Sequence, residues 1–269
     1  MIRSLALASA LAVAAIAAPA VAAGPFDAAI AGTWRKDADK ARDQYRHPAE
    51  TLKFLGVKPG QTVVEISPGG GWYTEILAPA MKGNGKYVAA LANPLASVNA
   101  AKSVENFKAK YADKAIYGEI GIGVFGKNAS GGVDEIVEPG SADVVLTFRN
   151  VHNWHMGGWD QEAFNAFFKA LKPGGMLGVV EHRLPEDRPD ADMKKSGYMK
   201  ASHVKMLAEK AGFKLAGSSE VNANPKDTKD YPDGVWTLPP TFQLKDQDRA
   251  KYATIGESDR MTLKFVKPR

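Results

Sequence analysis

Short apolar runs alternate with amphipathic stretches along most of the chain. The runs have the length of buried strands, and the stretches between them repeat apolar residues with the period of a helix. Such alternation predicts an α/β, doubly wound, mostly parallel sheet with helices on both faces. The predicted strands are residues 62–66, 86–91, 115–120, 142–148, 176–182, 213–220 and 260–266. The predicted helices among them are residues 71–81, 97–112, 161–171 and 200–211.

The N-terminal residues 1–23 have a different pattern from the rest of the chain. Arg3 precedes an apolar stretch over residues 5–18, and small residues follow at 20–23. This order is typical of a cleavable signal peptide. An uncleaved membrane anchor is the alternative, but the stretch is rich in alanine, which gains little from leaving water. We therefore predict a signal peptide over 1–23 and a periplasmic or secreted single domain over 24–269, without stable membrane insertion after cleavage.

The composition is that of an ordinary globular protein, with 45% hydrophobic and 24% charged residues in a chain of 269. The net charge is +5, but lysines and arginines are spread along the sequence and form no basic stripe. We therefore expect a small-molecule substrate and no nucleic-acid partner. The chain has no cysteine, which excludes disulfides, thiolate metal ligands and a thiol nucleophile. The oligomeric state does not follow from the sequence.

A glycine-rich turn joins the first predicted strand to the helix that follows it. Residues 62–79 read TVVEISPGGGWYTEILAP, so that a buried strand with an acid near its end leads into three consecutive glycines. Glycine permits a sharp turn and lets a ligand approach the backbone, and the start of a helix offers unpaired N–H groups to an anion. The alternative is a tight connection that binds nothing. The turn predicts a nucleotide pocket at the edge of the sheet.

Several motifs together resemble the class I S-adenosylmethionine-dependent methyltransferases. EISPGGG is similar to the acid-x-G-x-G-x-G motif of that family, with Glu65, Gly69 and Gly71 in its acid and glycine positions. LKPGG at 171–175 resembles the turn before the family's fifth strand, and ADVVLTFRNVHNW resembles its fourth-strand motif. The resemblance covers about residues 50–220 and the last strand, and the pattern is similar to an exported branch of predicted methyltransferases. It implies a Rossmann-like sheet of seven strands with the last strand antiparallel.

The resemblance also implies S-adenosylmethionine as the cofactor. The residues that it implies for cofactor binding are Glu65, Ser67, Gly69, Gly70, Gly71, Asn93, Glu119, Arg149 and Asn150. Glu119 would lie near the adenine, and Arg149 would bind a carboxylate of the cofactor or of an acidic substrate. The sequence departs from the family in two places: Ser67 and Pro68 replace the first glycine and its neighbour, and the second strand ends near Asn93 without the acid that binds the ribose hydroxyls.

Three histidines follow predicted strands. His152 and His155 come after the fourth strand, and His182 ends the fifth, so all three should lie at the carboxyl edge where open α/β sheets bind ligands. One of them, His152 first, could take a proton from the methyl acceptor. They could instead bind zinc or copper, or merely hydrogen-bond to loops. We favour a catalytic base and expect no metal.

Residues 222–259 form a long connection between the last two predicted strands. Such a connection is usually functional or disordered, and its prolines and aromatic residues favour an ordered loop. It could cover the cleft as a lid or protect the edge of the sheet. The sequence thus favours a methyltransferase that acts on an unknown small acceptor outside the cytoplasm. The alternative is a non-catalytic periplasmic protein that binds a small ligand or a metal on a degenerate methyltransferase fold.

Overall fold

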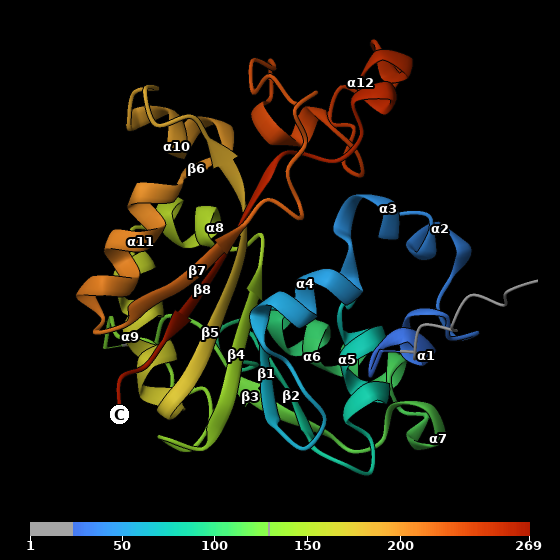
Figure 1. Ribbon diagram of the computed structural model, residues 1–269, viewed down its shortest axis with the longest axis vertical. Helices are drawn as coiled ribbons and strands as arrows, with labels where there is room; N and C mark the ends of the chain where they lie inside the picture. Colours follow the sequence, from blue (N-terminus) through green and yellow to red (C-terminus); the bar gives the residue numbers. More distant parts are fainter. Residues whose placement is uncertain (1–23, 129) are drawn as a thin grey trace, which may run out of the picture.

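The computed structural model describes residues 24–128 and 130–269, so the predicted signal peptide lies outside the described residues. In this part of the chain eight strands form one sheet in the order β3-β2-β1-β4-β5-β8-β7, with β6 paired to β5 (Figure 1). β8 runs opposite to the other strands of this sheet, so its pairings with β5 and β7 are antiparallel and the remaining pairings are parallel. The strands are β1 (Thr62–Ile66), β2 (Lys86–Leu91), β3 (Ile120–Val124), β4 (Ala142–Phe148), β5 (Leu171–Leu184), β6 (Met199–Lys200), β7 (Lys214–Ser219) and β8 (Arg260–Val266).

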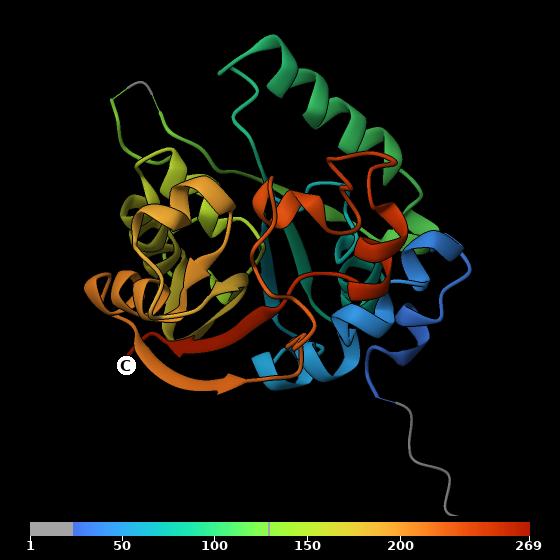
Figure 2. The same ribbon diagram turned by 90° about the horizontal axis from the view of Figure 1, so that it is seen from above.

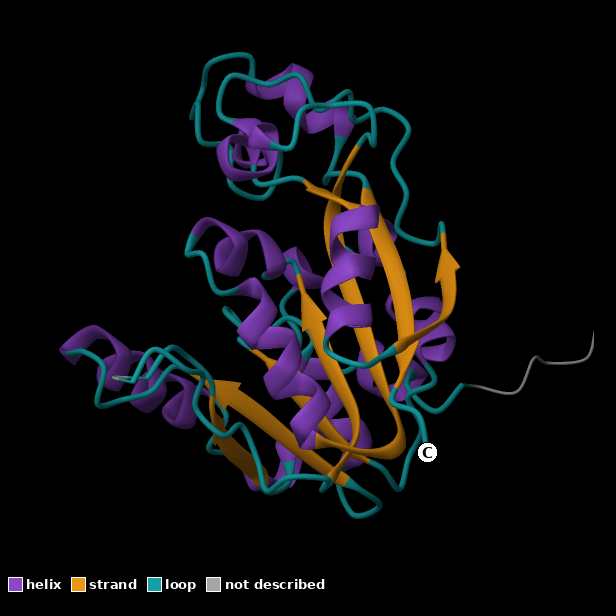
Figure 3. Ribbon diagram, turned by 90° about the vertical axis from the view of Figure 1, so that its left-hand side faces the viewer, coloured by secondary structure: helices purple, strands orange, loops and turns teal. Residues whose placement is uncertain are grey.

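Helices cover both faces of the sheet (Figure 3). Adjacent residues of a strand point to opposite faces, so Val63 packs in one apolar cluster with α4, α5 and α6, and Val64 packs in the other with α8, α9 and α11. The helices are α1 (Asp27–Ile30), α2 (Asp37–Lys40), α3 (Asp43–Arg46), α4 (Pro48–Leu55), α5 (Thr74–Met81), α6 (Val98–Lys110), α7 (Lys114–Tyr117), α8 (Val151–Met156), α9 (Asp160–Ala170), α10 (Ala191–Ser196), α11 (Ala201–Lys210), α12 (Arg249–Ile255) and the short 3-10 helix η1 (Gly234–Thr237). The predicted doubly wound, mostly parallel α/β fold is confirmed.

The third predicted strand was misplaced. Residues 114–117 form α7, because the side chain of Asp113 accepts a hydrogen bond from the backbone N–H of Ala115 and so caps that helix. The strand itself begins at Ile120 and reads IGIGV, a sequence with little strand character. Its glycines have a packing reason, since a Cβ at Gly123 would overlap the carbonyl oxygen of Ile136.

Two segments cover the carboxyl ends of the central strands (Figures 1 and 2). One consists of the N-terminal helices α2 and α3, and the other is the connection between β7 and β8, which contains η1 and α12. Glu257 from this connection forms ion pairs with Arg42 and Arg46, so the two segments are joined directly. None of the helices in the described ranges is long and apolar enough to span a bilayer.

Candidate functional site

A cleft of about 290 Å³ lies at the carboxyl edge of the sheet. Its walls come from the glycine turn after β1, the ends of β4 and β5, α2 and α3, and the connection between β7 and β8. The strand order reverses between β1 and β4, which is the place where doubly wound sheets bind ligands. From the connection come Val235, Trp236, Pro239, Pro240, Thr241, Glu257 and Ser258.

The glycine turn leaves its backbone open toward this cleft. Ser67 stands where the related motif has its first glycine and adopts the left-handed conformation, with φ of 49°. Gly69 and Gly70 line the cleft, and a Cβ on either would have no neighbour within 4 Å among the described residues. A ligand can therefore contact the backbone of the turn without meeting a side chain.

Gly71 has a packing role in the turn, which the sequence did not predict. Its φ is 80°, and a Cβ there would overlap the hydroxyl group of Tyr111, which donates a hydrogen bond to the carbonyl oxygen of Gly71 at 3.2 Å. Gly71 is not among the residues that line the cleft. This third glycine is required because the turn packs tightly against the end of α6.

Glu65 also acts behind the turn and not in the cleft. Its side chain is buried, and its carboxyl group accepts hydrogen bonds from the hydroxyl groups of Thr74 and Tyr87. Burial raises the pKa of Glu65 to about 7, although these two hydrogen bonds and the charge of Arg149 act to lower it. The residue therefore ties β1 to β2 and to the start of α5 behind the glycine turn.

Glu119 lies at the wrong edge of the sheet for adenine binding. It precedes β3, and the parallel register pairs Ile120 with Tyr87 near the start of β2, so Glu119 belongs to the amino edge. Its side chain is 80% exposed and forms an ion pair with Lys114 at 2.6 Å. The error followed from the misplaced third strand.

Asp134 supplies a carboxylate where the second strand lacks one. Asn93 follows the carboxyl end of β2, and its Nδ2 donates to a carboxylate oxygen of Asp134 at 3.2 Å, while its Oδ1 accepts from the backbone N–H of Leu95. Asp134 comes from the loop between β3 and β4. Sequence reasoning missed it because an acid in a long polar loop carries no signal of the strand end that it will approach.

Asn150 and Arg149 join the end of β4 to the cleft, which both line. The Nδ2 of Asn150 donates to the carbonyl oxygen of Ile66 at 3.0 Å, which fixes the glycine turn relative to β4. Arg149 has a left-handed backbone, with φ of 62°, and its side chain forms no hydrogen bond or ion pair with any described residue. Burial, together with the charges of Arg260 and Arg42, lowers the pKa of Arg149 to about 10, against the opposite effect of Glu257.

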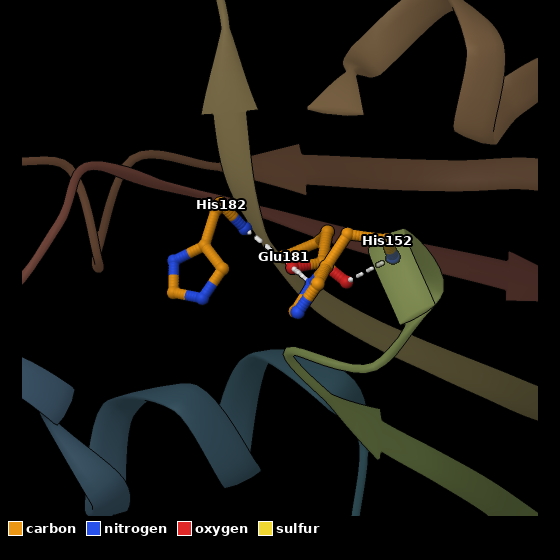
Figure 4. Close-up of side chains that lie close together, drawn as sticks. All are labelled: His152, Glu181 and His182. Carbon is orange, nitrogen blue, oxygen red and sulfur yellow. Dashed lines mark hydrogen bonds and ion pairs between the residues drawn. The ribbon is translucent and has the colours of Figure 1, made fainter. Parts of the chain in front are cut away.

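His152 and His182 meet at the end of β5, and Glu181 lies with them (Figure 4). The ring centroids of the two histidines are 5.3 Å apart, and both side chains line the cleft. Glu181 is fully buried and accepts hydrogen bonds from the backbone N–H groups of Val151, His152 and His182. Its Oε1 lies 3.0 Å from Nδ1 of His152. When Nδ1–H of His152 is donated to Oε1 of Glu181, Nε2 of His152 is free to take a proton.

His182 is held on its other side by the connection that covers the cleft. Its Nδ1 lies 2.5 Å from the hydroxyl oxygen of Ser258. Burial, followed by the charges of His152 and Arg149, lowers the pKa of His182 well below its usual value, so the ring is neutral at neutral pH. Donor atoms of His152, Glu181 and His182 lie within 4.8 Å of one another, so the three could also hold a metal ion.

His155 does not join this group. Helix α8 turns its side chain toward the start of α9, where Nδ1 lies 2.7 Å from a carboxylate oxygen of Asp160. The same oxygen lies 2.9 Å from Nε2 of His203. Although burial alone would raise it, the hydrogen bonds from His203 and His155 lower the pKa of Asp160 to about 2. His155 is absent from the cleft lining and is not a base for chemistry there.

Three residues of this region were not predicted from the sequence, namely Glu181, Arg42 and Arg46. Glu181 precedes His182 at the end of a predicted strand, so its place at the carboxyl edge could have been inferred. Arg42 and Arg46 are four residues apart in a polar N-terminal segment and both line the cleft. Nothing in that segment indicates which part of the sheet it will cover.

No protein-family model matches the chain, and its sequence has no significant match among curated proteins. Solved structures do resemble it. An S-adenosylmethionine-dependent methyltransferase from Aquifex aeolicus is 14% identical, with 84% of this chain and 93% of that chain covered and a TM-score of 0.53. A Galdieria sulphuraria protein, provisionally described as a sarcosine dimethylglycine methyltransferase, is 13% identical, with 87% and 91% covered and a TM-score of 0.52. The chain therefore has the class I methyltransferase, Rossmann-like fold.

A third similar structure shows that this fold does not fix the reaction. The [4+2]-cyclase SpnF is 15% identical, with 88% of this chain and 83% of that chain covered, and its TM-score is 0.52. The likeness to all three structures concerns the fold, and the activity has to be argued from the side chains of the cleft.

Proposed function

We propose that this protein is an S-adenosylmethionine-dependent methyltransferase that acts on a small molecule outside the cytoplasm. The observation that carries the proposal is the open backbone of Gly69 and Gly70 at the carboxyl end of β1, beside a cleft that contains a positioned histidine. The fold of the similar methyltransferase structures supports it.

The residues around the cleft fit the cofactor. The turn at Gly69 and Gly70 offers backbone groups without side-chain bulk, and Asn150 holds this turn in place. Beyond the lining of this cleft, Asn93 and Asp134 offer an amide and a carboxylate at the end of β2, where ribose hydroxyls could be bound. When bound, the cofactor would supply a methyl group on a positively charged sulfur. The contribution of these residues is positioning, which accounts for much of the catalysis of a displacement reaction.

His152 is the proposed base. Glu181 holds the Nδ1–H side of the ring, and three backbone N–H groups hold Glu181, so the orientation of Nε2 is fixed before a ligand enters. Nε2 would take the proton of the acceptor's attacking group. His182 is neutral and adds no competing positive charge beside His152. His152 and Glu181 thus form a pair of base and orienting carboxylate.

Calorimetric titration with S-adenosylhomocysteine tests the cofactor assignment. Wild-type protein is expected to bind one molecule per chain. Gly70→Val is expected to abolish binding, because its side chain would enter the cleft, while its circular dichroism should match wild type. Absence of binding by the wild type at about millimolar ligand, a very weak affinity, would contradict the assignment.

A metal-binding protein is the second candidate, since His152, Glu181 and His182 bring donor atoms within 4.8 Å. Both oxygens of Glu181 already accept backbone N–H groups, and a metal would have to displace the proton between Glu181 and His152. These contacts favour His152 as a base over a metal site. Elemental analysis of the purified protein decides, because stoichiometric zinc or copper that is lost in His152→Asn and His182→Asn would favour the metal site.

The location outside the cytoplasm rests on the residue pattern of 1–23, which lies outside the described residues. The mature chain is expected to begin at Ala23 or Gly24. N-terminal sequencing of the exported fraction checks this, and a chain that begins at Met1 in the cytosol would contradict it.

A further inference from the structure

Four arginines gather at one end of the cleft around a single buried carboxylate. Glu257 accepts from Nε of Arg42 at 2.6 Å and from Nε of Arg46 at 2.9 Å, and it lies 3.1 Å from Nη1 of Arg260. Arg149 lines the same cleft without an ion pair among the described residues. Although burial alone would raise it, the four arginines lower the pKa of Glu257 to about 2, so this carboxylate is ionised.

One further acid, Asp39, lies beside the four arginines, and the group stays positively charged despite it. Asp39 lines the cleft, but its carboxylate lies 3.9 Å from Nη1 of Arg42, at the limit of an ion pair. Glu181 is already occupied by backbone N–H groups and His152. The four guanidinium groups therefore exceed the carboxylates available to them, which is costly inside a protein unless a ligand supplies negative charge.

Several buried donors in this group have no acceptor. The side chain of Arg46 is 1% exposed, and neither its Nη1 nor its Nη2 has a hydrogen-bond partner in the described part of the chain. The same holds for Nη2 of Arg42. The ring of Trp72, 4.7 Å from the guanidinium carbon of Arg46, keeps this side chain beside the cleft. Unmet guanidinium donors that border a cavity are suited to carboxylate or phosphate oxygens.

The cofactor of the proposed function would not neutralise this charge. S-adenosylmethionine carries a sulfonium and an ammonium group against one carboxylate, so it would add a positive charge to the cleft. Its single carboxylate can form a bidentate pair with only one arginine, so the other arginines remain available to a second ligand. His152, the proposed base, lines the same cleft as Arg46 and Arg149.

We propose that Arg42, Arg46 and Arg149 bind the anionic end of the methyl acceptor, which is therefore a small organic acid that carries a carboxylate or phosphate group. The identity of this ligand as the acceptor rests on the proposed function. The anion site itself rests on the arginines alone.

Calorimetry of the whole protein at low salt tests the site with succinate and inorganic phosphate, each with and without S-adenosylhomocysteine. Wild type should bind at least one of them at about millimolar concentration or below, and should not bind the uncharged succinamide. The anion that binds more tightly identifies the group on the acceptor. Arg149→Gln breaks no ion pair among the described residues and should weaken anion binding by roughly tenfold or more, because charge-assisted hydrogen bonds are lost.

Arg46→Gln should have a similar effect, and Arg149→Gln remains informative if loss of the Arg46–Glu257 pair impairs folding. The matched control is Arg188→Gln, which removes a surface arginine paired with Asp192 and Asp230 and should leave anion binding unchanged. The inference is overturned if neither anion binds wild type, or if Arg149→Gln binds as tightly as Arg188→Gln. Anion binding without S-adenosylhomocysteine binding would uphold the anion site and contradict the methyltransferase.

Discussion

Nδ1 of His152 lies 3.0 Å from Oε1 of Glu181, and this carboxylate is itself fixed by the backbone N–H groups of Val151, His152 and His182. The two residues come from consecutive strands of the sheet order, one after β4 and the other near the end of β5. Parallel pairing places both strand ends at one edge, so the imidazole and its orienting carboxylate meet without any local sequence motif.

The first prediction concerns this pair. His152→Asn and Glu181→Gln should each reduce methyl transfer by roughly a hundredfold, because proton transfer and its orientation contribute on that scale. The affinity for S-adenosylhomocysteine should be nearly unchanged. Transfer of a labelled methyl group to the acidic small molecules of the native compartment measures the effect. His155→Asn is the matched control and should keep wild-type turnover, since His155 faces Asp160; equal losses in all three variants would contradict the assignment.

The second prediction concerns the carboxylate near the end of β2. Asp134→Ala should weaken S-adenosylhomocysteine binding by about tenfold or more, the usual effect of losing a hydrogen bond to a charged group. Glu119→Ala should have no effect, because Glu119 is exposed at the amino edge of the sheet. Calorimetric dissociation constants for the two variants decide the matter. Weaker binding in Glu119→Ala together with unchanged binding in Asp134→Ala would show that the ribose contact is assigned to the wrong acid.

The sequence pattern predicted the doubly wound sheet correctly but misplaced its third strand. The runs 62–66, 86–91, 142–148 and 260–266 are strands with the predicted bounds, because continuous apolar stretches are typical of strands buried on both faces. Residues 120–124 were not recognised as a strand because Gly121 packs against Val88 of β2 and Gly123 against Ile136, and the local sequence pattern does not contain those contacts.

Prediction of the site was limited for the same reason. The glycine turn, Asn150, His152 and His182 could be placed near the cleft, since each follows a recognisable strand. Asp134, Arg42 and Arg46 come from loops and short helices whose position depends on long-range packing, and their charges alone resemble an ordinary solvated surface. Tertiary arrangement, and not local propensity, brings these residues together.

The third prediction follows from the buried acid behind the turn. Glu65 has a pKa of about 7 in the folded chain, against an ordinary value of 4.5. Between these values the folded chain holds a proton that the unfolded chain has released, so the free energy of unfolding should fall as the pH rises from about 4.5 to 7. At 1.36 kcal/mol per pKa unit the contribution is roughly 3 kcal/mol, and Glu65→Gln should remove it.

Urea denaturation at several pH values between 4 and 8 measures this loss. The matched control is Glu105→Gln, in which an exposed carboxylate is replaced and the wild-type pH dependence should remain. An identical pH dependence in wild type and Glu65→Gln would show that the buried carboxyl group does not titrate in this range.

The fourth prediction separates the two functions of the glycine turn. Gly71→Ala should reduce the free energy of unfolding by on the order of 2–4 kcal/mol, because the side chain is strained at a φ of 80° and overlaps the Tyr111 hydroxyl. Gly70→Ala should be close to wild type in stability, since a Cβ there meets no described atom within 4 Å. Denaturant unfolding of the two variants checks this. Equal stabilities would mean that Gly71 is not required by packing.

The most direct test of the proposed cofactor site is a crystal structure of the protein grown with saturating S-adenosylhomocysteine. We expect electron density for the ligand in the cleft against the backbone of Gly69 and Gly70, with its ribose within hydrogen-bond distance of Asp134. Density at another site, or a cleft that contains only water or a metal ion bound to His152 and His182, would contradict it.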